Sequence, residues 1–152
     1  MKLFMLFAIL SISSCNLTGE LYIPDQNISI EVNTIQQALD YVSSYTYKLH
    51  YGVYTPEEFY TNGHGDCEDF SIMLLYLFTQ KLNLNAYLIL GKYNNSTNHA
   101  WVELSNGDWY DATAGCIITT RELFTPEYKY TYDEAIRSIF INGGFLPDVN
   151  KY

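Results

Sequence analysis

One segment constrains this chain more than any other: residues 68–81 are apolar on nearly every side of a helix. Phe70 and Leu74 follow one face at helical spacing, and Ile72 and Leu75 make the opposite face apolar as well. A helix that is hydrophobic nearly all round lies in the middle of a domain. The sequence therefore predicts a buried central helix, around which the rest of the chain packs.

Composition limits the class of protein. The 152 residues are about one domain in length, and 48% hydrophobic against 16% charged residues excludes a disordered tail. The formal net charge of −9 repels phosphate backbones, so we expect no nucleic-acid partner. Three cysteines and three histidines form neither a CxxC nor an HExxH pattern.

The N-terminus is interpreted as a lipoprotein-type signal peptide over residues 1–14. Its uncharged run, residues 3–12, is shorter than the roughly 20 residues that span a bilayer and has the size of a signal-peptide core. The run ends in Ile-Ser-Ser-Cys, which resembles a bacterial lipobox and makes Cys15 the lipidation site. An ordinary secretion signal cut nearby is the alternative. Both predict an exported protein, and the lipobox predicts a lipid anchor in a bacterial membrane, on its periplasmic or surface side.

The remaining chain is predicted to be a tether over residues 15–32 and a single α+β domain over residues 33–152. Asn33 is expected to cap a first helix that reaches about residue 47, and a turn-rich stretch follows. The predicted later elements are listed by residue: the buried helix 68–81, strands 86–90, 99–104 and 108–113, and a last helix around 133–140. Helices followed by an antiparallel meander indicate α+β rather than alternating βαβ units.

Cys67 stands at the mouth of the buried helix, in Gly-Asp-Cys-Glu-Asp-Phe-Ser. Unpaired N–H groups and the helix dipole stabilise an anion there, which favours the nucleophilic thiolate. The preceding Gly65 permits a tight turn and the close approach of a substrate backbone. The alternative is a buried inert thiol, since free cysteine is among the most buried residue types.

Two further segments supply the partners that a cysteine nucleophile needs. His99 begins the strand His-Ala-Trp-Val-Glu, and Asp111 lies in Trp-Tyr-Asp-Ala-Thr on the next strand. A nucleophile requires a base, and the base requires a group that orients it. Cysteine, histidine and aspartate occur in that order, with the last two on neighbouring strands.

These three motifs resemble the transglutaminase-like superfamily, and most of all the bacterial transglutaminase-like cysteine proteinases. The likeness covers residues 54–113 and implies a papain-like α+β fold. Carried over, it implies Cys67 as nucleophile, His99 as general base and acid, and Asp111 as the orienting carboxylate. It further implies an oxyanion hole made by the Cys67 backbone N–H and a second donor, for which Tyr54 is the candidate.

The turn between the two strands tests this assignment. A strict two-residue turn at Asn106-Gly107 makes paired residue numbers sum to 213 and turns Asp111 away from His99. A bulge with Gly107 in the left-handed region gives 212 and places Asp111 diagonal to His99, within reach of its side chain. A bulged or longer turn is therefore predicted.

Three acids, Asp66, Glu68 and Asp69, flank the nucleophile. Carboxylates beside a thiol raise its pKa, which opposes catalysis unless they point away or are neutralised. The resemblance implies calcium as one answer, held by Asp66 and Glu68 and extended by Asp69, because calcium takes several hard oxygens. Capping of the first helical turn is the other. No cofactor is expected to be required.

The other histidines and the last cysteine are given no catalytic part. His64 is interpreted as a loop residue, and His50 as a surface residue or core filler. Cys116 is interpreted as a structural thiol, with an inactivating disulfide to Cys67 as the alternative.

The function predicted on these grounds is that of an exported thiol hydrolase, which cleaves peptide or other amide bonds of envelope substrates through an acyl-enzyme. Two alternatives stand beside it. One is transglutaminase-type acyl transfer to an amine, which differs only in what reaches the acyl-enzyme. The other is a surface lipoprotein that uses the fold for binding without chemistry.

Overall fold

The computed structural model describes residues 28–142 and residue 152. The predicted signal peptide, the lipidation site Cys15 and most of the tether lie outside the described residues. None of the described helices is long and apolar enough to cross a membrane.

Four α-helices and seven strands make up the described fold. The helices are α1 (Ile35–Ser43), α2 (Pro56–Asn62), α3 (Cys67–Tyr76) and α4 (Tyr132–Ile141), with a π-helical turn at Leu77–Lys81 and a 3-10 turn at Arg121–Leu123. The strands are β1 (Thr46–Tyr47), β2 (His64–Gly65), β3 (Ala86–Tyr93), β4 (Thr97–Leu104), β5 (Trp109–Asp111), β6 (Cys116–Ile117) and β7 (Phe124–Tyr130).

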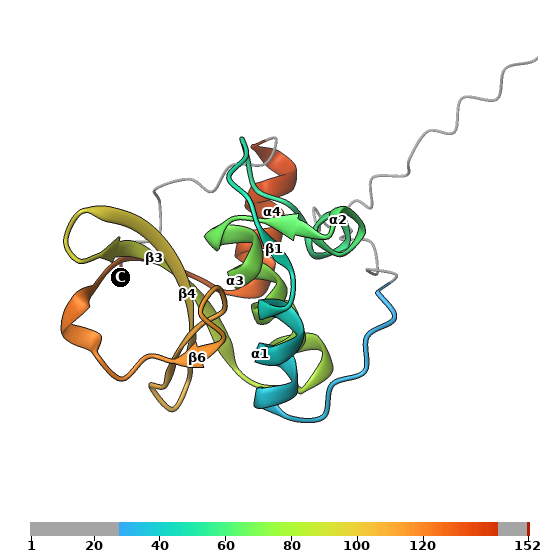
Figure 1. Ribbon diagram of the computed structural model, residues 1–152, viewed down its shortest axis with the longest axis horizontal. Coiled ribbons are helices and arrows are strands. Elements are labelled where there is room, and N and C mark those ends of the chain that lie inside the picture. Colours follow the sequence, from blue (N-terminus) through green and yellow to red (C-terminus); the bar gives the residue numbers. More distant parts are fainter. Residues whose placement is uncertain (1–27, 143–151) are drawn as a thin grey trace, which may run out of the picture.

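The central helix predicted from the apolar segment is α3. All of its residues except Glu68 are buried, and it contacts α1, α2 and α4 as well as the sheet (Figure 1). The chain continues from α3 through the π-helical turn and leaves it near Asn83, whose φ of 53° is left-handed, as predicted. The all-round apolar pattern thus identified the element on which the fold is built.

The main sheet has five antiparallel strands in the order β6-β5-β4-β3-β7. Leu88, Ala100 and Val102 belong to the main core with α3, whereas Ile89 and Trp101 belong to a second cluster on the other face. In Figure 1 this curved sheet lies to one side of α3 and the other helices to the opposite side. The α+β arrangement is as predicted.

The start and the end of the first helix differ from the prediction. Thr34, not Asn33, is the N-cap: its hydroxyl oxygen accepts the N–H of Gln37 at 3.1 Å. Asn33 instead donates its own N–H to the Gln37 side chain at 2.8 Å. The helix ends at Ser43 rather than near residue 47, because the chain there enters β1.

Helix α2 was not predicted, although its signals are present in the sequence. Thr55 and Glu58 form a reciprocal capping box, Pro56 occupies the first turn, and Gly63 ends the helix with a left-handed φ of 71°. The density of turn residues concealed a helix of only two turns. Strand β7 was also missed, because Pro126 and the charged residues beside it are atypical of a strand.

The turn between β4 and β5 follows the bulged alternative. Val102 pairs with Tyr110 and Glu103 with Trp109, so paired numbers sum to 212 as predicted. Gly107 has a φ of 91° and donates its N–H to the carbonyl of Leu104 at 2.8 Å. This register places Asp111 on the same side of the sheet as His99.

Candidate active site

Cys67 is the first residue of α3, directly after the N-cap Asp66. Its side chain is buried, with only 7% of the residue exposed. The Sγ atom donates to Glu68 Oε2 at 3.3 Å and lies next to the backbone N–H of Ala100. Because Ala100 follows His99 in β4, the thiol and the predicted base belong to adjoining parts of the site.

The electrostatics of Cys67 favour the protonated thiol. Burial raises the pKa of Cys67 most, and the negative charge and hydrogen bond of Glu68 and the charge of Asp66 raise it further. The N–H of Ala100 opposes this but is outweighed. The anion-stabilising effect expected of a helix N-terminus is therefore overcome by the two flanking carboxylates and by burial.

His99 and Asp111 are brought together on the sheet. His99 Nε2 lies 2.9 Å from Asp111 Oδ2, and Asp111 Oδ1 accepts the backbone N–H groups of Thr113 and Ala114. Burial alone would raise the pKa of Asp111, but the hydrogen bond and charge of His99 lower it below its ordinary value. Asp111 is thus a charged, anchored acceptor that fixes the orientation of the His99 ring.

The hydrogen bond to Asp111 uses Nε2 of His99, so Nδ1 is the ring nitrogen available to exchange a proton with a thiol. Among the described residues, Cys67 and His99 share no direct hydrogen bond. The thiol is instead turned to Glu68. The structure therefore assembles the His–Asp half of the predicted triad and places the cysteine beside it, with the thiol engaged elsewhere.

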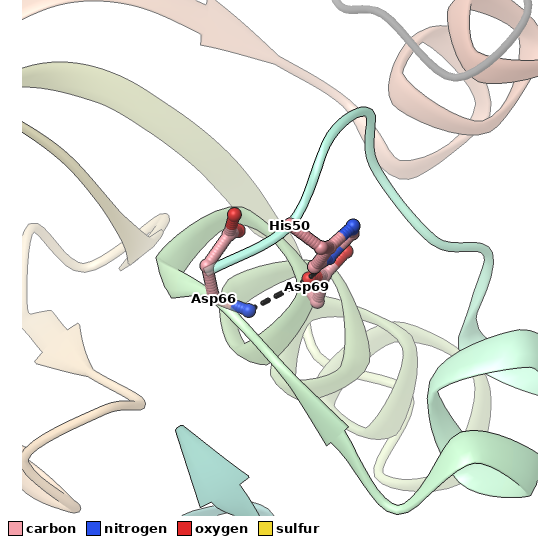
Figure 2. A group of neighbouring side chains, drawn as sticks. All are labelled: His50, Asp66 and Asp69. Carbon is pink, nitrogen blue, oxygen red and sulfur yellow. Dashed lines mark hydrogen bonds and ion pairs between the residues drawn. The ribbon is translucent and has the colours of Figure 1, made fainter. Parts of the chain in front are cut away.

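Asp69 forms a second histidine–carboxylate pair, with His50 (Figure 2). Its Oδ2 accepts from His50 Nε2 at 2.5 Å and from the Asp66 N–H at 2.8 Å, and its Oδ1 accepts the Tyr54 N–H at 2.6 Å. Asp69 is fully buried. Sequence reasoning missed this partnership because His50 lies 19 residues away and no local pattern connects the two.

Position 65 requires glycine because Asp69 packs directly against it. A Cβ atom at Gly65 would lie 2.5 Å from Asp69 Oδ2, closer than real Cβ atoms approach. The close neighbour of this glycine is therefore the folded-back carboxylate of the capping box, where the sequence analysis had expected a substrate backbone.

Tyr54, the predicted second oxyanion donor, is tied to the His50–Asp69 pair. Its ring stacks on His50 with centroids 4.0 Å apart, and its backbone N–H donates to Asp69. Tyr47 is an aromatic neighbour of the site that the prediction missed. Burial raises the pKa of Tyr47, and the charges of Cys67 and the three flanking acids raise it further.

The acids that flank Cys67 divide into two roles. Asp66 and Asp69 form the capping box of α3, so the capping interpretation holds for both. Both carboxylate oxygens of Asp69 already accept hydrogen bonds, three in total. Asp66 and Glu68 face each other instead: burial raises the pKa of Glu68, and the hydrogen bond and charge of Asp66 raise it further.

Asp66 and Glu68 are therefore the residues suited to a cation. The ligand atoms of Asp66, Cys67 and Glu68 all lie within 4.8 Å of one another. Two carboxylates this close together offer hard oxygen ligands of the kind that calcium takes. The donor set fits calcium through this pair rather than through Asp69.

The remaining histidine and cysteine have contacts of their own. His64 lies in strand β2 rather than in the loop that the sequence predicted for it, and its Nδ1 contacts the carbonyl of Asn62 at 3.1 Å. Cys116 is exposed and pairs in register with Asp111, and both Cys67 and Cys116 are free thiols.

Comparisons with known proteins agree with this architecture. The sequence model described as "Transglutaminase-like superfamily" matches residues 24–114. Among solved structures, calcium-bound LapG of Legionella pneumophila is similar with a TM-score of 0.57 at 16% identity, over 64% of this chain. The match spans 63% of the LapG chain. A search of curated proteins found no match.

Proposed function

Because the chain belongs to the transglutaminase-like superfamily, we propose that it is a thiol hydrolase that cleaves peptide or other amide bonds. The observation that carries this proposal is the joint position of Cys67 at the start of α3 and of the His99–Asp111 pair on the adjoining strands. A nucleophile, a base and an orienting carboxylate are the parts that such a reaction needs.

The chemistry follows from these three side chains. His99 Nδ1 takes the proton of Cys67, and the thiolate attacks the carbonyl carbon of the amide. The tetrahedral oxyanion accepts the Cys67 backbone N–H, which is free of helical bonding because Cys67 is the first residue of α3. The C–N bond then breaks, and the amine leaves with the proton from His99.

The second half of the reaction releases the thioester. His99 removes a proton from water, the resulting hydroxide attacks the acyl carbon, and the C–S bond breaks. The carboxylic acid departs and the proton returns to Cys67. Asp111 stabilises the imidazolium form of His99 in both halves.

The raised pKa of Cys67 sets a condition on this mechanism. With Glu68 and Asp66 charged beside it, the thiol keeps its proton. Calcium bound by Asp66 and Glu68 would supply positive charge that offsets both carboxylates. The hydrogen bond from Cys67 to Glu68 would then be weaker, and the thiol would lose its proton more readily. Calcium is therefore expected to activate the site.

The test is the rate at which iodoacetamide alkylates Cys67 across pH, with and without millimolar calcium. Peptide mapping separates this reaction from that of the exposed Cys116. We expect Cys67 of the calcium-loaded protein to react faster than free cysteine at neutral pH, and His99→Ala to abolish the advantage. A rate no greater than that of free cysteine, unchanged by His99→Ala, would leave the fold as a binding module.

Acyl transfer to an amine shares every step up to the thioester. Adding an amine such as a lysine derivative to the acyl-enzyme separates the two reactions: a hydrolase releases acid, whereas a transferase releases the amide in proportion to the amine added.

We also propose that the protein is exported and anchored through lipid on Cys15, which would place its substrates in the bacterial envelope. The support is the apolar run of residues 3–12 and the lipobox-like Ile-Ser-Ser-Cys that ends it. Cells fed an alkyne-tagged fatty acid should label the wild-type protein and not Cys15→Ala. Labelling that survives this substitution would exclude Cys15 as the anchor.

A further inference from the structure

Strand β1 has one edge without a partner strand in the described part of the chain. It pairs only with β2, in a two-stranded parallel sheet. The N–H groups of Thr46 and Lys48 donate to the carbonyls of Gly63 and Gly65, at 3.3 and 2.7 Å. Successive residues of a strand direct their backbone groups to opposite edges, so those of Tyr47 point to the open one.

Tyr47, the residue at this open edge, lies near the nucleophile. Tyr47 pairs in register with Gly65, which is two residues before Cys67. The Tyr47 ring also contacts Phe70 in the first turns of α3, with ring centroids 6.2 Å apart. A chain that paired with this edge would form a third strand next to β1, on the side opposite β2 and in contact with the Tyr47 residue that borders α3.

Three large hydrophobic side chains along this segment are exposed. Tyr47 is 50% exposed, Leu49 75% and Tyr51 89%. Single exposed apolar residues are ordinary on a protein surface, but these three belong to β1 and to the segment that directly follows it. Positions 47 and 49 have the side-chain spacing of an extended peptide.

We propose that the open edge of β1 binds an extended segment of the substrate as an added strand, with apolar substrate side chains against Tyr47 and Leu49. This inference rests on the proposed hydrolase function and names the substrate class: an extended polypeptide with apolar residues at alternate positions. Backbone pairing supplies affinity in such strand addition, and the alternate side chains supply selectivity.

The position of the edge favours substrate over other occupants. A polypeptide whose carbonyl reaches Cys67 must continue past the residues that border α3, and Tyr47 is one of them. The substrate segment is therefore apolar at alternate positions.

The test uses a peptidyl chloromethyl ketone that carries apolar residues at alternate positions. Its reaction with Cys67 forms a carbon–sulfur bond and releases chloride. The reference reagents are a single-residue chloromethyl ketone and iodoacetamide, all applied to the whole protein in millimolar calcium. We expect the peptidyl reagent to react about tenfold faster than the single-residue one, the worth of one buried apolar side chain.

Two changes probe the two parts of the proposal. Methylation of the peptide nitrogen that faces Tyr47 should lower the rate by about threefold to tenfold, since one hydrogen bond is lost. Leu49→Ser should remove most of the peptide advantage, whereas Lys48→Ser, on the alternate side of the segment, should keep it. Neither variant should alter the iodoacetamide rate.

The outcomes separate this inference from the proposed function. A slow iodoacetamide reaction of wild-type Cys67 would mean that the hydrolase proposal fails. A fast iodoacetamide reaction without a peptide advantage would overturn the β1 edge alone, as would a full effect of Leu49→Ser with no effect of N-methylation. Loss of a dimer in Leu49→Ser, measured by light scattering, would assign the edge to a second copy of this chain instead.

Discussion

Two histidine–aspartate pairs lie near the start of α3, and they differ in what surrounds them. His99 and Asp111 come from neighbouring strands and keep side-chain exposures of 17% and 13%. His50 and Asp69 join a loop to the buried helix, with exposures of 12% and 0%. The same two residue types thus form one pair in which both side chains reach solvent and one in which only the histidine does.

The effects on pKa separate the two pairs further. The pKa of Asp111 is lowered, because the hydrogen bond and charge of His99 outweigh burial. The pKa of Asp69 is raised, because its burial outweighs three hydrogen bonds. His99 keeps a ring nitrogen for proton exchange with a substrate, whereas both ring nitrogens of His50 are engaged, by Asp69 and by the Tyr51 carbonyl. We therefore expect His99 to take part in the reaction and His50 to stabilise the fold.

The largest expected effect concerns the rate of the reaction. His99→Ala should lower acylation of Cys67 by p-nitrophenyl acetate about 100-fold to 10,000-fold, the usual contribution of a general base. His50→Ala should leave this rate near that of the wild type while the protein stays folded. First-turnover release of p-nitrophenolate measures both. The reverse result would identify His50–Asp69 as the working pair.

Unfolding in urea provides the second test of the comparison. Asp69→Ala should lower the free energy of unfolding by about 3 kcal/mol, because three buried donors lose their acceptor. Asp111→Ala also removes three hydrogen bonds, yet water can reach this site, so a loss of about 1 kcal/mol is expected. Equal losses would contradict the difference in burial.

Calcium should act on the acids that flank Cys67. If Asp66 and Glu68 bind it, calcium at ten times its Kd should stabilise the wild type by about 1.4 kcal/mol, measured as a rise in Tm. Glu68→Gln should abolish the rise, while magnesium should produce less of it in the wild type. An unchanged Tm in the wild type, together with unchanged alkylation of Cys67, would exclude this cation.

The smallest expected effect is a pH dependence of stability that comes from the His50–Asp69 pair. Burial would lower the pKa of His50, but the hydrogen bond and charge of Asp69 raise it above the ordinary value. Protonated His50 therefore stabilises the fold fully below about pH 6.5, the ordinary pKa of histidine. This contribution is lost as the pH rises through the raised pKa of the folded state.

Urea midpoints measured from acidic to alkaline pH check this expectation. The wild-type midpoint should fall across that window, and the fall should be smaller in His50→Gln. His64→Gln is the matched control, because its ring bonds to a backbone carbonyl and not to a carboxylate. The same slope in all three proteins would show that His50 does not contribute.

Local pattern carried much of the prediction. The apolar periodicity of residues 68–81 identified α3. The requirement that paired residue numbers of β4 and β5 have an even sum identified the register that joins His99 to Asp111. Capping signals were less reliable. The first cap was displaced by one residue to Thr34, and the capping box that begins α2 was hidden among turn residues.

The sequence by itself determined the central helix, the α+β order and the three residue types of the candidate triad, because periodicity and spacing act over a few residues. The tertiary structure alone decided that Asp69 is closed off by His50 and that Tyr47 stands beside Cys67. It also decided that burial and Glu68 raise the pKa of the nucleophile. Burial and the distances between charges depend on segments that are remote in the chain, so no local pattern encodes them.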